Sequence, residues 1–345
     1  MYKCAIVAVS GGRANGHAEP YEKGIIKRGQ LACISTRNRE NLDAFGDRYG
    51  VDARYTDYRE MFEKEKPDLV HVNTPPDVRL EIFEAAEETG VPSIIVEKPL
   101  AIQGEDYLAI HEFAQNSKVK IAINHQLHYH PRRFKLQEMV KEGKIGELRF
   151  IDASARMNLA YQGTHTLQGI AAFHPAGKPV SIMGQVSGAR GLGESRGRHY
   201  APDQCLGSVV FEDNVSAMLR CGTNAPYVLP SDERVNVHKQ VAAYGTHGFV
   251  HWTMWGWETN INGVYERGEH SYPEEDVMGQ AAMTEAMFDW MEDDNAVHAL
   301  NLDAALQDFN IVLKMYMSAL NNKVYTLDDA PQGDLIAALR GVLGE

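Results

Sequence analysis

Apolar residues in the first third of the chain gather in short runs that do not alternate strictly with polar residues. Runs of this kind are typical of strands buried on both faces. They occur at residues 3–9, 31–35, 69–73, 93–96 and 120–123. Between them lie stretches with helical spacing, several of which end at a glycine. Helices are therefore expected near residues 20–28, 42–49, 78–89 and 106–115, with a short one capped by Asp57 and Glu60.

Strand and helix thus alternate at short intervals over residues 1–124. This order is typical of a parallel sheet that is wrapped by helices, because each parallel crossover needs a helix to return the chain. We therefore predict an α/β fold class with an N-terminal Rossmann domain, a doubly wound parallel sheet, over residues 1–124.

A different pattern begins after Gly143. Residues 215–221 and 235–243 alternate between apolar and polar, and residues 249–255 follow a glycine-bounded turn. Such segments are typical of half-buried antiparallel strands joined by hairpins. Two apolar helices, near residues 283–291 and 306–320, close the chain. Residues 125–345 are thus expected to form an α+β domain with a large, mainly antiparallel sheet, whose final helices can pack back on the Rossmann domain. Trp252, Trp255 and Trp257 cluster in one hairpin and favour a sheet face used for dimerisation.

The composition excludes several functions. Lys and Arg number 34 and Asp and Glu 47, which leaves a formal charge of −13 on 345 residues. So acidic a surface repels nucleic acid and anionic lipid, and no basic patch in the sequence offsets it. No apolar run is long enough to span a bilayer, and no secretory signal is visible, so a cytoplasmic protein is expected. The scattered cysteines are typical of buried thiols rather than of disulfides or a zinc site; they are Cys4, Cys33, Cys205 and Cys221.

A glycine-containing turn follows the first expected strand. Read as Val9-x-Gly11-x-x-Ala14, it retains two small residues of the dinucleotide-binding fingerprint and lacks the first glycine. The turn joins a strand to a helix, where free backbone N–H groups and the helix dipole face an anion. We therefore expect a dinucleotide cofactor to bind at Ser10, Gly11, Gly12, Arg13 and Ala14.

The second expected strand ends in Ser35, Thr36 and Arg37. NAD-preferring sites usually place Asp or Glu near this point, because a carboxylate accepts hydrogen bonds from the ribose 2′-hydroxyl. Two hydroxyls and a guanidinium suit a 2′-phosphate instead. These three residues favour NADP(H) over NAD(H).

Glu97-Lys98-Pro99 ends the strand expected at residues 93–96, at the rim where open α/β sheets bind ligands. Pro99 favours an extended conformation at Lys98, and Glu97 can hold the lysine ammonium. Together with Asn73-Thr74-Pro75-Pro76, this element resembles the Gfo/Idh/MocA oxidoreductases, named for glucose–fructose oxidoreductase and inositol dehydrogenase. The resemblance covers nearly the whole chain and continues through short motifs at residues 143–146, 163–165, 245–248 and 318–320.

The resemblance implies an N-terminal Rossmann domain and a C-terminal open-faced sheet that serves substrate binding and oligomerisation, as a homodimer or homotetramer. It implies NAD(P)-dependent oxidation or reduction of a sugar, sugar derivative or polyol. It further implies that the cofactor region includes Asn73, Thr74, Pro75, Glu97 and Lys98, and that Lys98 also contacts the substrate and aids proton transfer.

The chain departs from the family at its catalytic stretch. The family pattern Asp-x-Gly-x-His corresponds to residues 161–165, where His165 is retained and Tyr161 replaces the Asp. Gln168 stands where a further Asp is often found, and His128 where an Arg is common. Without the carboxylate, His165 and Lys98 must carry the proton chemistry, with the Tyr161 phenol as a donor. The substrate is thus expected to contact Lys98, His128, Tyr161 and His165.

Three functions stay open at this point. The first is the sugar or polyol dehydrogenase just described. The second is an NAD-dependent enzyme that cleaves glycosides by transient oxidation and elimination, and the third is a non-catalytic, cofactor-binding regulator. His125, His128 and His130 lie close together in the sequence, but no nearby carboxylate or cysteine completes a metal site, so no metal is expected. The sequence leaves open which sugar or polyol is bound and in which direction the reaction runs.

Overall fold

The computed structural model describes residues 1–193 and 198–344, and these residues form two compact units. The N-terminal unit consists of Met1–Leu100, Leu108–Tyr129 and Asp276–Leu306. The C-terminal unit comprises Ala101–Tyr107, His130–Glu275 and the described residues from Gln307 onward. A segment from late in the sequence therefore completes the N-terminal unit.

The N-terminal unit is built on a parallel sheet of six strands, in the order β3-β2-β1-β4-β5-β6. The sequence order reverses between β1 and β4, and this reversal marks the point where doubly wound sheets bind their ligands. The strands are β1 (Tyr2–Val7), β2 (Gly29–Ser35), β3 (Ala53–Tyr55), β4 (Leu69–Val72), β5 (Ser93–Glu97) and β6 (Lys120–Asn124).

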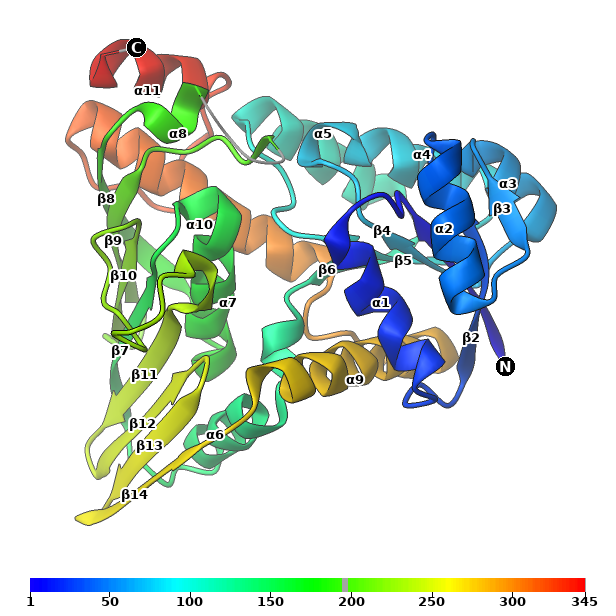
Figure 1. Cartoon of the computed structure of the whole chain (residues 1–345). Helices are drawn as coiled ribbons and strands as arrows, with labels where there is room; N and C mark the ends of the chain where they lie inside the picture. The colour runs from blue at the N-terminus through cyan, green and yellow to red at the C-terminus, as the bar shows by residue number, and fades with distance from the viewer. Residues whose placement is uncertain (194–197, 345) are drawn as a thin grey trace. The chain divides into compact units, whose positions relative to one another are not determined.

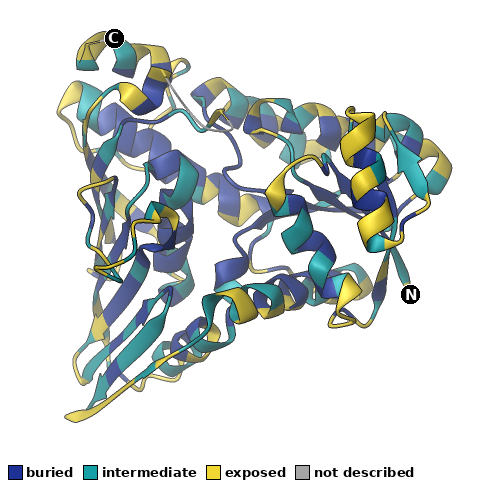
Figure 2. Cartoon of the chain, in the orientation of Figure 1, coloured by how far each residue is buried: buried dark blue, intermediate teal, exposed yellow. Residues whose placement is uncertain are grey.

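Helices cover this sheet, as the alternating pattern predicts (Figure 1). They are α1 (Gly12–Glu22), α2 (Arg39–Tyr49), α3 (Tyr58–Glu65), the 3-10 turn η1 (Pro76–Val78), α4 (Arg79–Thr89) and α5 (Gly104–Asn116). Helix α9 (Tyr272–Glu292) adds a late layer, because Met283, Met287 and Phe288 pack against Cys4, Leu69 and Ile95 of three strands. The central strands are buried throughout (Figure 2).

The first helix lies earlier than the sequence pattern predicts. It spans Gly12–Glu22 and begins directly at the glycine turn, so the expectation of a helix over residues 20–28 is wrong. Gly24 adopts a left-handed φ of 61°, and the N–H groups of Ile25 and Ile26 both bond to the Pro20 carbonyl. This arrangement ends the helix at Glu22 and leaves the following residues in a turn.

Ala8 occupies the left-handed position of the first turn, with φ of 67°. Its N–H donates to the Ser35 carbonyl at 2.7 Å, which holds the turn against the end of β2. Left-handed backbone is costly for any residue with a Cβ, and glycine relieves that cost. The strained residue of this turn is therefore Ala8, which directly precedes the Val9 position of the fingerprint.

The C-terminal unit is built on an eight-stranded sheet in the order β14-β13-β12-β11-β7-β10-β9-β8. Every neighbouring pair is antiparallel except β7 and β10, which confirms the mainly antiparallel prediction. The strands are β7 (Leu148–Ala155), β8 (Pro179–Ser187), β9 (Gln204–Phe211), β10 (Ser216–Cys221), β11 (Lys239–Gly245), β12 (Gly248–Thr253), β13 (Gly256–Ile261) and β14 (Val264–Glu269).

Two details of this sheet differ from the prediction. Strands β10 and β11 do not form a hairpin, because β7 lies between them. The residues Val235–Val237 form a 3-10 turn, η5, rather than the start of a strand. Alternating apolar residues predict a half-buried face here, but they do not reveal which strand is the neighbour.

Helices pack on one side of the second sheet. Helix α7 (Thr164–Phe173) contacts β7 and β11, and α6 (Pro131–Lys141) contacts β12. Helix α10 (Leu302–Asn321) approaches β8 so closely that a Cβ on Gly184 would meet the Met315 backbone at 2.4 Å. The remaining helical segments are η2 (Gln126–Tyr129), η3 (Leu159–Gly163), α8 (Arg190–Gly193) and α11 (Leu335–Leu343).

The same sheet also carries partly exposed apolar side chains, among them Met183, Leu206, Val210 and Met218. Trp252 is not among them, since it is 1% exposed, so its expected place on an exposed dimerisation face is wrong. It pairs with Trp257 across β12 and β13, as the predicted hairpin requires.

All four cysteines are buried free thiols, as predicted. Burial is the main cause that raises the pKa of Cys4 to about 12, which keeps this thiol protonated and unreactive. Among the described residues, no helix combines the length and apolar character needed to cross a bilayer.

Replacing Ala8 with glycine is expected to raise the free energy of unfolding, measured by urea titration. The left-handed backbone costs alanine roughly 1–2 kcal/mol, and the extra freedom of an unfolded glycine returns roughly 0.5–1 of it. Ala5, which is fully buried in β1, provides the matched control, because Ala5→Gly should lower stability by about 1 kcal/mol. Equal losses in the two variants would contradict this account of the turn.

Candidate functional site

The edge of the first sheet at the β1–β4 reversal brings several predicted cofactor residues together. Helix α1 begins at Gly12 with no side-chain cap at Gly11 and no acidic residue in its first turn. A Cβ built at Gly11 or Gly12 would meet no heavy atom within 4 Å, so a ligand can approach this backbone closely. These N–H groups and the positive end of the helix dipole suit a phosphate.

The neighbouring strand β4 ends in polar side chains that the protein itself does not satisfy. Both side-chain polar atoms of Asn73, and the hydroxyl of Thr74, are buried and have no hydrogen-bond partner in the described part of the chain. Buried polar groups are normally paired, so these atoms indicate that an outside ligand binds here. Taken with the open turn at Gly11 and Gly12, they fit a dinucleotide cofactor.

The three residues predicted to recognise the ribose, at the end of β2, differ in their exposure. Thr36 hydrogen-bonds the Ser10 hydroxyl at 2.8 Å, which links two predicted cofactor residues. Ser35 is only 2% exposed, and its carbonyl accepts the Ala8 N–H. Arg37 is exposed, and Asn38 caps α2 through its side chain. Thr36 and Arg37 can therefore reach a ligand, while Ser35 shapes the turn.

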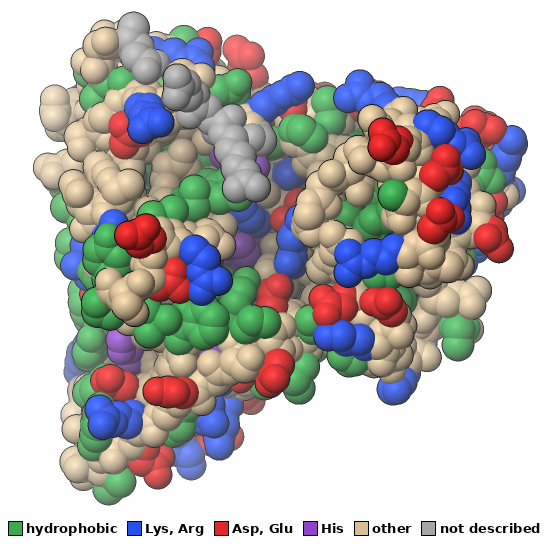
Figure 3. All heavy atoms as spheres, viewed as in Figure 1, with side chains coloured by type: hydrophobic (Ala, Val, Ile, Leu, Met, Phe, Trp, Pro, Cys, Tyr) green, Lys and Arg blue, Asp and Glu red, His purple; other side chains and the backbone are tan. Residues whose placement is uncertain are grey.

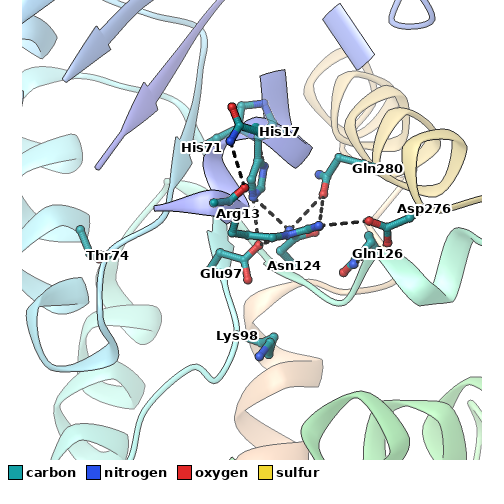
Figure 4. Close-up of polar contacts among 12 residues, drawn as sticks. Arg13, His17, His71, Thr74, Glu97, Lys98, Asn124, Gln126, Asp276 and Gln280 are labelled. Carbon is teal, nitrogen blue, oxygen red and sulfur yellow. Dashed lines mark hydrogen bonds and ion pairs between the residues drawn. The ribbon is translucent and has the colours of Figure 1, made fainter. Parts of the chain in front are cut away.

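A buried carboxylate lies at the end of β5. One oxygen of Glu97, Oε1, accepts hydrogen bonds from Arg13 Nε at 2.8 Å, His17 Nε2 at 3.0 Å and Asn124 Nδ2 at 2.5 Å (Figure 4). Gln280 of α9 accepts from both Arg13 and Asn124, at 2.7 and 3.1 Å. We call these five residues the Glu97 cluster.

The surroundings of Glu97 keep it ionised. Burial is the largest single influence and raises the pKa of its carboxyl, but Arg13, His17 and Lys98 together outweigh burial and hold that pKa well below its ordinary value. Lys98 is 8% exposed, and burial lowers the pKa of its ammonium to about 8. Glu97 opposes that fall, while Arg13 and Arg79 add to it. A lysine in this range can give or take a proton near neutrality.

The guanidinium of Arg13, a predicted cofactor residue, is held by three side chains of the protein. It binds Glu97, Gln280 and Asp276, the last at 3.2 Å. Asp276 also accepts from Gln126 at 2.8 Å. Arg13 thus joins α1 to α9 beside Lys98.

A buried arginine, Arg79, hydrogen-bonds the backbone of the two loops that carry Thr74 and Lys98. Arg79 is 1% exposed, and its NH2 group donates to the Thr74 carbonyl at 3.1 Å and to the Lys98 carbonyl at 3.5 Å. It therefore fixes the backbone on both sides of the predicted nicotinamide region. The Lys98–Pro99 peptide bond is cis.

The remaining predicted catalytic residues belong to the C-terminal unit. Tyr161 lies in the π-helical turn η3, where the Asn158 side chain accepts its N–H at 2.8 Å and His199 packs edge-on against its ring at 4.9 Å. His165 lies in the first turn of α7 and is 5% exposed. The two residues sit one helical turn apart on a continuous helical segment.

Gln168 follows on α7 and has a structural partner. It accepts a hydrogen bond at 3.0 Å from Arg133, which is 1% exposed. Burial lowers the pKa of Arg133 to about 9. A neutral amide therefore contacts a buried cation at this position, where the sequence resemblance leads one to expect a carboxylate.

The three neighbouring histidines do not share a face. His125 and His128 belong to the N-terminal unit, where His128 packs edge-on against Tyr129 at 4.8 Å in η2. His130 belongs to the C-terminal unit and lies 3.8 Å from Glu275. In residues 1–193 and 198–344, no group of three potential metal-ligating side chains is found.

Figure 3 shows acidic and basic side chains intermixed over the N-terminal unit on the face that it presents. This mixing does not form the continuous basic stripe that nucleic-acid binding requires on that face.

Comparison with known proteins supports the nucleotide-binding assignment. Residues 2–125 match the GFO_IDH_MocA model, described as an oxidoreductase family with an NAD-binding Rossmann fold. A dTDP-3,4-didehydro-2,6-dideoxy-alpha-D-glucose 3-reductase of Saccharopolyspora spinosa is 24% identical over 120 residues, which is 35% of this chain and 36% of that protein. A D-xylose 1-dehydrogenase (NADP(+)) 2 of Haloferax volcanii is 22% identical over 111 residues, 32% of this chain and 34% of that protein. The chain thus covers about a third of the length of these curated relatives.

Solved structures extend the likeness to both units. A levoglucosan dehydrogenase in complex with NADH and L-sorbose has a TM-score of 0.78 at 15% identity, covering 96% of this chain and 99% of that one. At this identity the likeness concerns the fold. It confirms the predicted combination of a Rossmann domain with a second, mainly antiparallel domain.

Proposed function

We propose that this chain, which belongs through its NAD-binding Rossmann domain to the Gfo/Idh/MocA oxidoreductase family, is a dehydrogenase or reductase of a sugar, sugar derivative or polyol. The observation that carries the proposal is the Glu97–Lys98 pair at the ligand-binding edge of the sheet. There a buried lysine with a pKa of about 8 lies beside a permanently ionised carboxylate. Relatives named for a xylose dehydrogenase and a deoxysugar reductase support the substrate class.

When bound, the nicotinamide ring gives or accepts the hydride. The residues of this chain then have three tasks. Gly11 and Gly12 bind phosphate through their backbone N–H groups. The buried polar atoms of the Asn73 and Thr74 side chains form hydrogen bonds with the cofactor. Lys98 and His165 take the hydroxyl proton during oxidation or return it during reduction, and Tyr161 donates a hydrogen bond in place of the carboxylate usual in the family. Pro75 and His128 complete the proposed contacts.

The cofactor is proposed to be NADP(H) rather than NAD(H), because Thr36 and Arg37 offer a hydroxyl and a cation at the end of β2. NADPH should bind at least about 10-fold more tightly than NADH, and Arg37→Ala should weaken NADPH binding by about 10-fold while sparing NADH. Arg39→Ala is the matched control, because Arg39 is also exposed and is paired with Asp43 at 3.0 Å. Fluorescence titration with both nucleotides measures the dissociation constants. Equal affinities, or tighter NADH binding, would sink the preference.

The proton chemistry is tested on sugars and polyols screened with both cofactors in both directions. Lys98→Met and His165→Ala should each lower kcat by about 10²–10⁴-fold, since each removes a proposed acid–base group. Because burial lowers the pKa of Lys98 to about 8, neutral lysine accumulates as the pH rises, and oxidation should accelerate through about pH 8 and then level off. Tyr161→Phe tests the phenol separately.

The control for these variants is Lys118→Met, which removes an exposed lysine from the same unit and should leave kcat unchanged. Nucleotide binding should persist in Lys98→Met and His165→Ala, which separates loss of chemistry from loss of the site. Turnover within a few-fold of wild type in both would refute the assignment.

We also propose that the second sheet mediates a homodimer or homotetramer. Met183, Leu206, Val210 and Met218 of β8, β9 and β10 are between 36% and 45% exposed, an unusual density of apolar side chains for a solvated surface. Light scattering should give at least twice the chain mass of 38.5 kDa. Met183→Asp combined with Met218→Asp should yield a monomer, whereas Val342→Asp on α11 should not. A concentration-independent monomer in the wild type would overturn this assembly.

A further inference from the structure

Behind Glu97, an unbroken line of hydrogen bonds runs through two histidines to a tyrosine. His17 Nδ1 lies 3.0 Å from His71 Nδ1, and His71 Nε2 lies 2.8 Å from the Tyr21 hydroxyl. His17 and His71 are fully buried, and Figure 4 shows His71 beside His17 of the Glu97 cluster. His17 and Tyr21 come from α1, and His71 from β4.

The order of the protons along this line follows from the atoms that meet. Glu97 is ionised and can only accept, so His17 must donate from Nε2. Asn124 Nδ2 also lies 3.1 Å from His17 Nε2, but its two N–H groups are directed to Glu97 and Gln280, so the proton between His17 and Glu97 comes from His17.

Both histidines are held neutral, since burial is the largest cause that lowers the pKa of each. Neutral His17 then accepts at Nδ1, which requires His71 to donate from its own Nδ1 and to accept at Nε2. The Tyr21 hydroxyl is left as the donor to His71. Each residue of this line fixes the tautomer of the next. The last hydrogen bond is donated by His17 to the Glu97 carboxylate, next to Lys98 in the chain.

We propose that Tyr21, His71 and His17 are positioning residues for Lys98, acting through a hydrogen-bond relay that holds the Glu97 carboxylate ionised and correctly oriented. This inference rests on the proposed function only where it refers to catalysis by Lys98. The relay itself is a property of the protein without substrate.

The charged groups around the relay determine how the protonation of Glu97 should change when a relay residue is removed. Glu97 faces Arg13 from α1, Lys98 from its own strand end and Arg79 from α4, and Asp276 of α9 competes for Arg13. Tyr21 faces the Cys4 thiol of β1 and Glu285 of α9. When the His17 donor is removed, Arg13 and Asn124 still donate to Glu97. The carboxylate should therefore keep its position but gain affinity for a proton. The pKa of Glu97 should rise, because the hydrogen bond from His17 is one of the causes that hold it low.

The first experiment observes the tautomers directly. Long-range ¹⁵N–¹H correlation spectra of the uniformly labelled full chain should show His17 protonated at Nε2 and His71 at Nδ1, both neutral at about pH 7. Tyr21→Phe should release His71 into a mixture of tautomers. Tyr58→Phe is the matched control, because Tyr58 also donates to a carboxylate, Glu81 at 2.8 Å, and lies elsewhere in the unit. Opposite tautomers, or charged imidazoles at about pH 7, would overturn the relay.

The second experiment measures kcat/KM against pH with the sugar that the screen identifies. In the wild type, the acid side of the profile should show the fall through about pH 8 that follows from protonation of Lys98, and Glu97 should add none because it stays ionised. His17→Leu and His71→Leu should each show a further acid limb, displaced upward in pH because Glu97 has gained affinity for a proton, and a loss in kcat of about 10-fold with nucleotide affinity retained. Tyr21→Phe should show a smaller displacement of the same sign.

His17→Gln separates the direct donor from the relay behind it. A glutamine amide can still donate to Glu97, so this variant should recover most of the activity lost in His17→Leu. If His71→Leu and Tyr21→Phe match wild type in both spectra and pH profile, the relay beyond His17 is refuted. If the wild type oxidises no sugar, the proposed function fails, and the spectra still decide whether the relay exists.

Discussion

Placing an ionised carboxylate inside a sheet of apolar strands is the constraint on which the N-terminal unit depends. A buried carboxylate without partners would lose several kcal/mol of hydration, so its neighbours must supply hydrogen bonds and opposite charge. Glu97 draws these from α1, β6 and, through Gln280, from α9. The late segment that carries Gln280 and Asp276 is therefore part of the N-terminal unit for an electrostatic reason as well as for the packing of Met283 and Phe288.

This constraint explains why the site is partly readable from sequence. Most strand and helix positions follow from local periodicity. A strand buried on both faces is apolar along its whole length, so its own residues are enough to identify it. The parallel direction of the strands also follows, since a helix returns the chain between one strand and the next. The short strand β3 does not, because three residues are too few to show a pattern. The position of α1 does not, because an open glycine turn can begin a helix without an apolar stripe, and the mixed composition of α1 offers little periodicity. The partners of β10 are hidden for a related reason, since alternation specifies a buried face and not a neighbour.

The site divides in the same way. Glu97 and Lys98 can be found from a short motif, because both lie on one strand end whose chemistry is local. Their partners cannot, because Gln280 and Asp276 are far away in sequence and belong to no motif. His17 is an intermediate case. It lies four residues after Arg13 on α1, so the two share a helix face, and a search for polar pairs at that spacing would have found it.

Arg13 lies at the start of α1, beside the glycine turn, and its guanidinium has structural partners in addition to its predicted role at the cofactor. A cation beside the phosphate-binding turn is a reasonable phosphate ligand, yet its guanidinium is engaged by Glu97, Asp276 and Gln280. Two carboxylates within hydrogen-bond reach cancel much of its charge, so the attraction for an anionic dinucleotide must come mainly from backbone N–H groups at the start of α1. The acidic protein can then bind an anion without a basic patch, because the favourable field is local, made of dipoles, and little affected by the net charge of −13.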